Sequence, residues 1–228
     1  MGSGGVTKLA VFDLDGTLMD GQSGALFSTY LFRRGELSLL RAVGLFQWAL
    51  RYKLHLPHRE EQARELVLGA ILDKTPDEID QIMRDFHQEV MVPRYREDAR
   101  AEVERLKALG FTTLLVSATF RPIAEACAET FGFDGVVATD MEKDERGAYT
   151  GRVDADVVSG KEKLVAATSW ANERFGKDGW RIAYAYGDHH TDRAMLSAAD
   201  QPYAVSPDHT LKRTARRLGW PVLEWSHR

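Results

Sequence analysis

The sequence predicts an α/β fold in which helices cover both faces of a mostly parallel sheet, with a helical insertion after the first strand. A short apolar run at 8–12 ends abruptly in polar residues, as a buried strand does. From about residue 98 onward, short apolar runs alternate with segments of helical periodicity. This alternation favours a parallel sheet, because a helix can supply the crossover that each parallel connection needs. Residues 18–96 contain no convincing strand pattern, which predicts the helical insertion.

The composition is that of an ordinary soluble globular protein: of 228 residues, 44% are hydrophobic and 28% are charged. The length fits one large domain, or a core domain that carries a smaller one. A formal net charge of −4 provides no general attraction to nucleic acid, so we expect no nucleic-acid partner. The single cysteine, Cys127, excludes an intramolecular disulfide, and its helical spacing with Ile123 and Phe131 predicts a buried thiol.

We expect a cytoplasmic protein, because the fold needs no disulfide and therefore no oxidising compartment. Residues 1–5 resemble a flexible leader, since no basic region with a long apolar segment follows them as in a signal peptide. No run of about eighteen uncharged apolar residues occurs, so the sequence predicts no transmembrane helix.

The insertion at 19–96 is predicted to contain several helices, because its apolar residues recur at helical spacing and three prolines interrupt it. Its unusual part is the stretch 33–56, which is apolar nearly all round. Between residues 21 and 59 the sequence contains six lysines and arginines but one acidic residue, Glu36. Two interpretations stay open. A basic apolar helix with aromatic residues can lie in a membrane interface, and the same helix can pack inside a small helical domain.

The second part of the chain has a more regular pattern, and glycines mark several of the expected helix ends. The expected elements, in order, are a helix at 98–109, a strand at 112–116, a helix at 122–131, a short strand at 136–138, a hairpin-like excursion at 140–153, a helix at 161–175, a strand at 181–186, a helix at 192–199, a strand at 203–205, and a last helix around 211–218 before 222–223.

Two carboxylates, Asp13 and Asp15, follow the first strand directly, and Gly16 and Thr17 come after them. Side chains two residues apart point the same way along an extended chain, so one cation or one phosphoryl group could contact both. The alternative is that Asp15 and Gly16 form only a turn, since this dipeptide is common in turns. Polar groups at the ends of later strands would favour the ligand-binding interpretation over a simple turn.

Such groups do recur, at Ser117 and Thr119, at Lys161, and at Asp188 and Asp192. Right-handed crossovers bring the ends of parallel strands to one edge of the sheet, where ligands bind in open α/β folds. Asp188 and Asp192 could complete an oxygen-lined cation site with Asp13 and the backbone carbonyl of Asp15. Mg²⁺ suits such a site, because it takes few carboxylates and keeps water and phosphate as further ligands.

Two further groups in this set favour an anionic ligand. Ser117 is expected where a helix begins, and free N–H groups at a helix N-terminus bind anions. Lys161 adds a point positive charge for a phosphate oxygen or for a nucleophile.

The four motifs together resemble the haloacid dehalogenase superfamily, in its phosphoserine phosphatase-like branch, subfamily IB. The motifs are DLDGT at 13–17, LLVSAT ending at Thr119, GKEKL at 160–164 and YGDHHTDRAML at 186–196. The resemblance covers nearly the whole chain. It implies a Rossmann-like three-layer core formed by residues 6–18 and 97–228, and a helical cap domain at 19–96 that closes over the site.

The resemblance also implies roles for individual residues. Asp13 would be the nucleophile that becomes an aspartyl-phosphate, and Asp15 would act as general acid and then as general base. Lys161 would serve in catalysis and in holding the phosphoryl group, together with Thr17, Ser117, Ala118 and Thr119. The implied cofactor is Mg²⁺, with Asp13, Asp15, Asp188 and Asp192 as its ligands. A carboxylate attacks a dianionic phosphate only when cations neutralise the repulsion, so the residue types suit this chemistry.

The implied function is Mg²⁺-dependent hydrolysis of a phosphomonoester, either a small phosphorylated metabolite or a lipid head group phosphate. A phosphotransferase with the same chemistry, a phosphatidylglycerophosphate or phosphoserine phosphatase, and a non-catalytic binding module are the alternatives. Ala118 and Thr119 stand where phosphoserine phosphatases tend to have glycines, so the substrate is left open. His189 and His190 either bind or tune a metal or are solvent-facing loop residues. The basic apolar stretch 33–56 is the expected place of a membrane contact.

Overall fold

The computed structural model describes residues 5–53, 60–154 and 157–226. Its elements, in chain order, are β1 (Thr7–Phe12), α1 (Ser23–Arg33), α2 (Leu39–Lys53), α3 (Glu60–Leu68), α4 (Pro76–Phe86), a π-helical turn (His87–Met91), a 3₁₀ turn (Val92–Arg94), α5 (Glu97–Ala108), β2 (Thr112–Phe120), α6 (Arg121–Phe131), β3 (Gly135–Lys143), β4 (Tyr149–Asp154), α7 (Lys161–Phe175), β5 (Trp180–Gly187), a 3₁₀ turn (His190–Asp192), α8 (Arg193–Ser197), β6 (Gln201–Val205), α9 (His209–Leu218) and β7 (Val222–Leu223).

A seven-stranded sheet runs through the molecule in the order β4-β3-β2-β1-β5-β6-β7. Every neighbouring pair is parallel except β3 and β4, which are antiparallel at one edge. β1 is central, with Phe12 beside Leu115 of β2 and Tyr186 of β5. The predicted mostly parallel α/β sheet is confirmed, and its central strand is the one that ends at Asp13.

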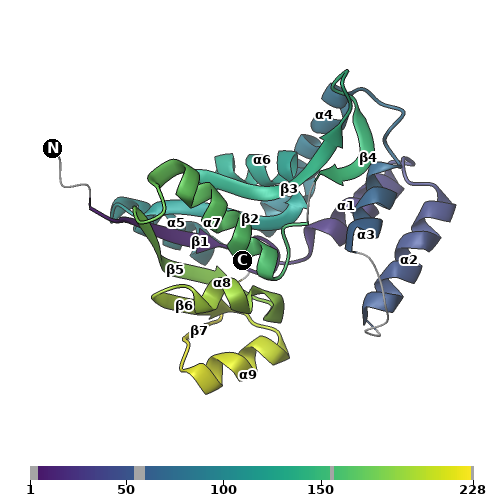
Figure 1. Cartoon of the computed structure of the whole chain (residues 1–228). Coiled ribbons are helices and arrows are strands. Elements are labelled where there is room, and N and C mark those ends of the chain that lie inside the picture. The colour runs from purple at the N-terminus through teal and green to yellow at the C-terminus, as the bar shows by residue number, and fades with distance from the viewer. Residues whose placement is uncertain (1–4, 54–59, 155–156, 227–228) are drawn as a thin grey trace.

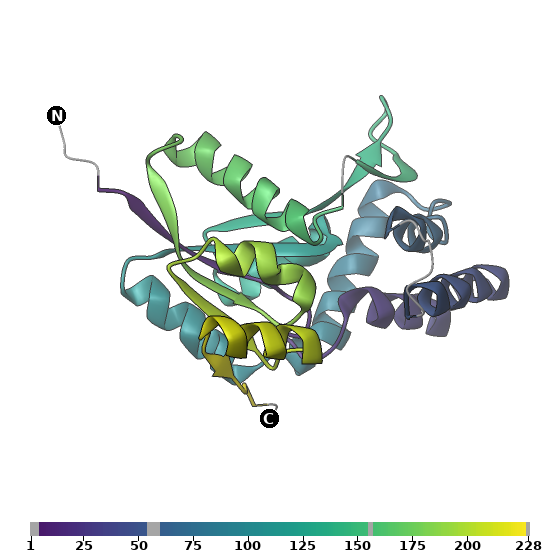
Figure 2. The ribbon, with the colours of Figure 1, turned by 60° about the horizontal axis from the view of Figure 1, so that its bottom comes forward.

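Helices cover both faces of the sheet (Figure 1). Alternate residues of β1 enter two separate cores, one on each face. Leu9 and Val11 pack with buried residues of α7, α8 and α9. Ala10 and Phe12 pack with buried residues of α5 and α6. Side chains alternate between the faces of a strand, so helices on both faces bury β1 completely and form three layers. Figure 2 shows α7 above the sheet and α5 below it.

The helical insertion lies between β1 and α5, as predicted. Buried residues of its helices, among them Phe27, Leu31, Ile79 and Phe86, belong to the same core as Phe12. Thr75 caps α4 by accepting a hydrogen bond from the Glu78 backbone, and Pro76 follows at the first helical position. The insertion therefore shares the apolar core of the α5–α6 face and extends beyond the carboxyl ends of the strands (Figure 1), while its division from the core at 19–96 stays a prediction.

The antiparallel hairpin of β3 and β4 is longer than the sequence indicated. β3 runs without a break from Gly135 to Lys143, where the pattern predicted a short strand and a separate excursion. The hairpin contacts the insertion: the Tyr149 hydroxyl donates to Asp80 of α4 at 2.7 Å. A Cβ on Gly151, whose φ is +84°, would lie 2.6 Å from Leu72. This close approach ties the edge of the sheet to the helical part.

Two other predictions need comment. The buried thiol is confirmed, since Cys127 is fully buried and accepts a hydrogen bond from the Tyr95 hydroxyl. The stretch 33–56 contains α2, and its residues 54–56, like Pro57 and the leader at 1–4, lie outside the described residues. Within the described part of the chain, no helix is long and apolar enough to cross a membrane.

Candidate active site

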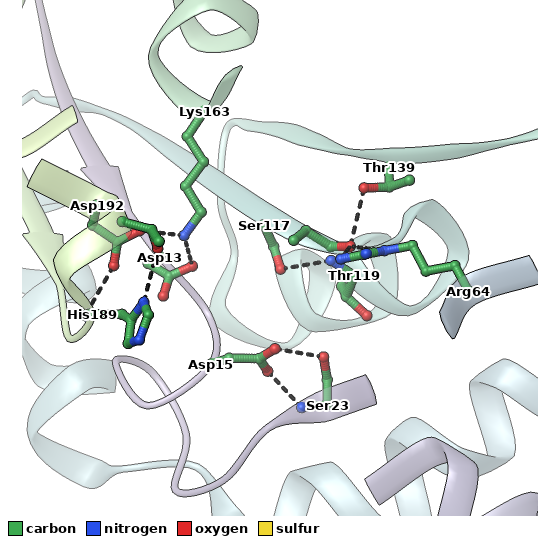
Figure 3. A network of polar contacts seen from close by, with 12 residues as sticks. Asp13, Asp15, Ser23, Arg64, Ser117, Thr119, Thr139, Lys163, His189 and Asp192 are labelled. Carbon is green, nitrogen blue, oxygen red and sulfur yellow. Dashed lines mark hydrogen bonds and ion pairs between the residues drawn. The ribbon is translucent and has the colours of Figure 1, made fainter. Parts of the chain in front are cut away.

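The polar motifs meet at the carboxyl ends of the central parallel strands (Figure 3). Asp13 follows β1, Ser117 lies near the end of β2, and Asp188 follows β5. The first turn of α7 brings Lys163 to the same edge. Because all three strands are parallel neighbours, their last residues share one edge of the sheet, which is where open α/β folds bind ligands.

Lys163 lies between two buried carboxylates. Its Nζ is 2.6 Å from Oδ1 of Asp13 and 2.6 Å from Oδ1 of Asp192 (Figure 3). The Lys163 and Asp13 side chains are only 7% and 5% exposed, and that of Asp192 is fully buried. Burial alone would lower the pKa of Lys163, but the two carboxylates outweigh it and raise the pKa. The lysine is therefore a fixed cation at neutral pH.

Carboxylates outnumber cations in this cluster. Asp13, Asp188 and Asp192 each offer an oxygen, and these oxygens lie within 4.8 Å of one another. Burial raises the pKa of Asp188, and the neighbouring Asp13 and Asp192 charges raise it further. Burial also raises the pKa of Asp13, against the opposing effect of Lys163. Two buried carboxylates and a partly buried one beside one lysine leave negative charge that a divalent cation would neutralise, and hard oxygen donors are the ligands that Mg²⁺ prefers.

The prediction that Lys161 provides the cation of this site is wrong. Lys161 is the first residue of α7, its side chain is 86% exposed, and its Nζ lies 3.7 Å from Glu162. Residues two apart on an α-helix lie roughly 200° apart around the axis, so only one of the two lysines can face the site. The sequence did contain a signal that favours Lys163. It precedes Ala167 and Ala171 by four and eight residues, which places it on the same side of α7 as these buried alanines.

The Asp15 carboxylate is held by the first residue of α1. One oxygen accepts from the Ser23 backbone N–H and the other from the Ser23 hydroxyl, both at 2.8 Å (Figure 3). Burial raises the pKa of Asp15, and these two hydrogen bonds oppose the increase. The prediction of Asp15 as a metal ligand concerned its backbone carbonyl, and it stays a prediction.

Glycine at position 16 allows Asp188 to approach the turn after β1. Gly16 has a φ of +76°, in the region that favours glycine, and a Cβ there would lie 2.0 Å from Oδ2 of Asp188. Thr17 follows, fully buried, and its hydroxyl has no hydrogen-bond partner among the described residues. The DLDGT motif thus combines two carboxylates with a turn that leaves room for a third.

Ser117 is buried but does not begin a helix as expected. β2 continues to Phe120 and α6 begins at Arg121. The Ser117 hydroxyl accepts a hydrogen bond from the Thr119 backbone N–H at 3.1 Å. Between these two residues, the Ala118 carbonyl accepts from the Thr139 hydroxyl at 3.0 Å.

Arg64 and Ser23 are functional candidates that the sequence analysis missed. Arg64 of α3 donates to the Ala118 carbonyl through Nε at 3.0 Å and Nη2 at 2.9 Å (Figure 3). The insertion therefore reaches the end of β2 from 54 residues away in the chain. Arg64 lies three and four residues before the buried Val67 and Leu68, so it is on the apolar side of α3. An arginine in such a position could have been recognised in the sequence as a candidate for a functional role. No local pattern marked Ser23.

His189 and His190 form a second cluster beside the carboxylates, with Asp208 at the start of α9. His189 Nε2 and His190 Nδ1 lie 3.3 and 3.1 Å from Oδ2 of Asp208. The His189 backbone N–H donates to Asp192 at 3.2 Å. Burial lowers the pKa of His189, and neighbouring His190 contributes to the shift. These contacts attach the loop that carries Asp188 and Asp192 to α9, and a contact of either histidine with a metal stays untested.

Comparison with known proteins identifies a family for this architecture. A model of the haloacid dehalogenase-like hydrolases matches residues 10–197. A histidinol-phosphatase of Neisseria meningitidis serogroup C (strain 8013) is 26% identical over 229 residues, which cover 96% of this chain and 99% of the relative. The phosphoserine phosphatase SerB1 of Mycobacterium tuberculosis H37Rv is 26% identical over 223 residues, covering 96% of this chain and 71% of that protein.

Solved structures share the fold over nearly the whole chain. A protein of unknown function from Bordetella pertussis Tohama I superposes with a TM-score of 0.85 at 29% identity, covering 96% of this chain and 99% of that one. A substrate-bound phosphoserine phosphatase superposes with a TM-score of 0.63 at 20% identity, covering 96% and 93% of the two chains. At that identity the second likeness concerns the fold alone.

Proposed function

Because this chain belongs to the haloacid dehalogenase-like hydrolase family and is a phosphatase, we propose that it hydrolyses a small phosphomonoester with Mg²⁺ and with Asp13 as nucleophile. The observation that carries the proposal is the buried Asp13–Lys163–Asp192 group at the edge of the sheet. A carboxylate attacks phosphorus only where positive charge offsets the repulsion between the two anions, and Lys163 is the cation in contact with Asp13.

The metal would be held by Asp13, Asp188 and Asp192, with the Asp15 carbonyl as a further candidate ligand. The excess of buried carboxylates over cations among these residues supports this assignment. Bound Mg²⁺ would supply positive charge that stabilises the transferring phosphoryl group. Lys163 fixes the orientation of the Asp13 carboxylate through its hydrogen bond to Oδ1, which leaves Oδ2 as the attacking atom.

The proposed reaction has two displacements at phosphorus. In the first, Oδ2 of Asp13 forms a bond to phosphorus while the bond from phosphorus to the substrate oxygen breaks, and protonated Asp15 donates its proton to that oxygen. In the second, the Asp15 carboxylate accepts a proton from water, whose oxygen attacks the aspartyl-phosphate and releases inorganic phosphate and Asp13. Ser23 positions Asp15 for both proton transfers through its two hydrogen bonds.

Ser117, Ala118 and Thr119 are proposed to hold the phosphoryl group at the end of β2, with Thr17 behind the turn after β1. Arg64 keeps this segment in place by binding the Ala118 carbonyl from the insertion. The insertion therefore contributes to the shape of the site, and we propose that it selects the substrate.

Among substrates, we place histidinol phosphate first and phosphoserine second. The Neisseria relative named histidinol-phosphatase matches this chain over 99% of its own length. Both candidates are small phosphomonoesters of an alcohol that carries an amino group. A lipid head group phosphate is a further member of the test panel, because of the basic apolar stretch in the insertion.

The test is release of inorganic phosphate from this panel and from p-nitrophenyl phosphate, with Mg²⁺ and with a chelator. We expect hydrolysis that needs the metal and that Asp13→Asn reduces by at least about a thousandfold. Asp20→Asn, which removes a carboxylate outside the cluster of Asp13, Asp188 and Asp192, is the control and should retain activity. Full activity of Asp13→Asn would overturn the proposal, and transfer to an acceptor alcohol without hydrolysis would favour a phosphotransferase.

A further inference from the structure

The outer side of α2 is apolar and exposed. Leu39, Val43, Phe46 and Leu50 recur at intervals of four, three and four residues, which places them in one stripe along the helix. Leu39 is 72% exposed and Phe46 69%, and Leu40 beside them is 86% exposed. A surface helix of a globular protein normally turns such a stripe toward the core.

The inner side of α2 faces α3 and accounts for the packing of the helix. Ala42 and Leu45 pack on the buried core, and a Cβ on Gly44 would lie 3.4 Å from Leu66 of α3. Arg41 also lies on this side, 3.5 Å from where a Cβ on Gly69 would be. The helix thus buries one side, which includes Leu45, and leaves most of its large apolar residues on the outer side. Figure 1 shows α2 on the far side of α3 from the sheet.

Exposed basic residues lie on α2 itself and in the segment just before it in the chain. Arg51 is exposed on α2, and Arg33 and Arg34 are exposed at the end of α1, next to the half-exposed Phe32. The one acidic residue between 21 and 59, Glu36, already pairs with Lys74 at 3.1 Å. A second copy of the chain on this surface would bring like charges together, whereas an anionic surface would complement them.

We propose that the outer side of α2 docks on the surface of a lipid bilayer that contains anionic lipids. Its apolar stripe enters the boundary between head groups and acyl chains, and the arginines contact lipid phosphates. The helix lies in the plane of the interface, and α3 separates it from the catalytic edge, where Arg64 binds β2. Docking therefore leaves the carboxylate cluster uncovered.

Vesicle co-sedimentation tests the proposal with the full chain. We expect binding to vesicles of equimolar phosphatidylcholine and phosphatidylglycerol, much weaker binding to phosphatidylcholine alone, and a decrease as salt is added. Leu40→Ser with Phe46→Ser should reduce the affinity for anionic vesicles by about tenfold or more. The matched control is Leu109→Ser, which changes a 61% exposed leucine at the end of α5 and should bind like the wild type.

A fluorescent label reports which surface meets the lipid. The only native cysteine, Cys127, is fully buried, so an added surface cysteine can be labelled selectively with an environment-sensitive dye. We expect a blue shift on anionic vesicles for label at Phe46→Cys and none for label at Leu109→Cys. Circular dichroism and thermal unfolding verify that each variant is folded.

Three results would overturn the proposal: no binding of the wild type to anionic vesicles, binding that the Leu40→Ser and Phe46→Ser variant retains in full, or equal blue shifts at both labelled positions. Sedimentation velocity tests the alternative that this surface binds a second copy of the chain. A concentration-dependent dimer that the double variant abolishes, without vesicle binding, would assign this surface to self-association. None of these readouts depends on the proposed phosphatase reaction.

Discussion

Lys163 contacts two carboxylates at once, and both are buried with it. Breaking a buried ion pair by removing one partner typically costs about 3–5 kcal/mol of folding free energy, because the remaining charge has no compensation. Here the remaining groups would be Asp13 and Asp192, whose repulsion also opposes attack on an anionic phosphate. One lysine thus contributes both to stability and to the electrostatic environment of the proposed nucleophile.

At the residue scale, we expect that replacing the two lysines of the GKEKL motif will affect kcat/KM very differently. Lys163→Met should lower kcat/KM for p-nitrophenyl phosphate by about a hundredfold or more, because it removes the cation beside Asp13. Lys161→Met should leave kcat/KM within about twofold of the wild type, since that side chain is exposed and pairs only weakly with Glu162.

Steady-state kinetics on both variants, with thermal unfolding to confirm folding, provides the measurement. The reverse pattern, in which Lys161→Met is the inactive variant, would mean that the arrangement of the first turn of α7 described above is wrong.

At the scale of elements, the helical insertion is joined to the catalytic edge by two polar connections. Ser23 at the start of α1 holds Asp15, and Arg64 of α3 holds the Ala118 carbonyl. The β3–β4 hairpin adds a third connection on the other side through Tyr149 and Asp80. The insertion is therefore positioned by hydrogen bonds at the site itself as well as by the apolar core that it shares with the sheet.

Removing the Arg64 connection should weaken substrate binding more than it slows the chemical step. Arg64→Leu leaves the Ala118 carbonyl with its hydrogen bond from Thr139, so the end of β2 keeps one partner. We expect KM to rise several-fold while kcat falls by less than about threefold, because Arg64 acts on the site through Ala118.

The matched control for Arg64 is Arg84→Leu, since Arg84 of α4 bonds to the neighbouring Gln81 on the exposed side of that helix. Its kinetic constants should equal those of the wild type. Steady-state kinetics over a range of substrate concentrations separates KM from kcat, and an unchanged KM in Arg64→Leu would show that this contact has no part in shaping the site.

At the scale of the whole molecule, the site assembles residues from both ends of the chain. Asp13 and Lys163 are 150 positions apart, and Lys163 and Asp192 are 29 apart. The Asp13 and Asp192 carboxylates are buried with Lys163 where β1 ends and where α7 and α8 begin. Any cation that neutralises this cluster should therefore stabilise the whole fold, because it binds the native arrangement and not the unfolded chain.

We expect Mg²⁺ to raise the melting temperature. At a hundred times its dissociation constant, a ligand specific for the native state contributes about 2.7 kcal/mol, which corresponds to roughly 5–10 °C for a chain of this length. Asp188→Asn should abolish most of this shift. Asp208→Asn, in the separate histidine cluster, should retain it, since asparagine also caps helices well.

Differential scanning fluorimetry with and without Mg²⁺ measures these shifts. A melting temperature that Mg²⁺ leaves unchanged in the wild type would contradict the proposed metal site, and a shift that depends on Asp208 would relocate it.

The sequence by itself determined the α/β class, the parallel sheet, the helical insertion after the first strand and the places where polar motifs end the strands. These features follow from local information, since apolar runs, helical periodicity and turn residues reflect burial along one segment. The sequence also placed Asp13, Ser117, Asp188 and Asp192 at one edge of the sheet, because the handedness of the crossovers fixes where parallel strands end.

Only the tertiary structure decided how each helix is rotated and what its side chains meet. Rotation of α7 selects Lys163 over Lys161, although the two are separated by one residue. Rotation of α2 turns Leu39, Val43, Phe46 and Leu50 outward, against the usual pattern. The contacts of Arg64 with Ala118 and of Ser23 with Asp15 join segments with no shared local pattern. Packing free energy summed over the whole molecule sets these orientations, and no single segment of sequence contains that sum.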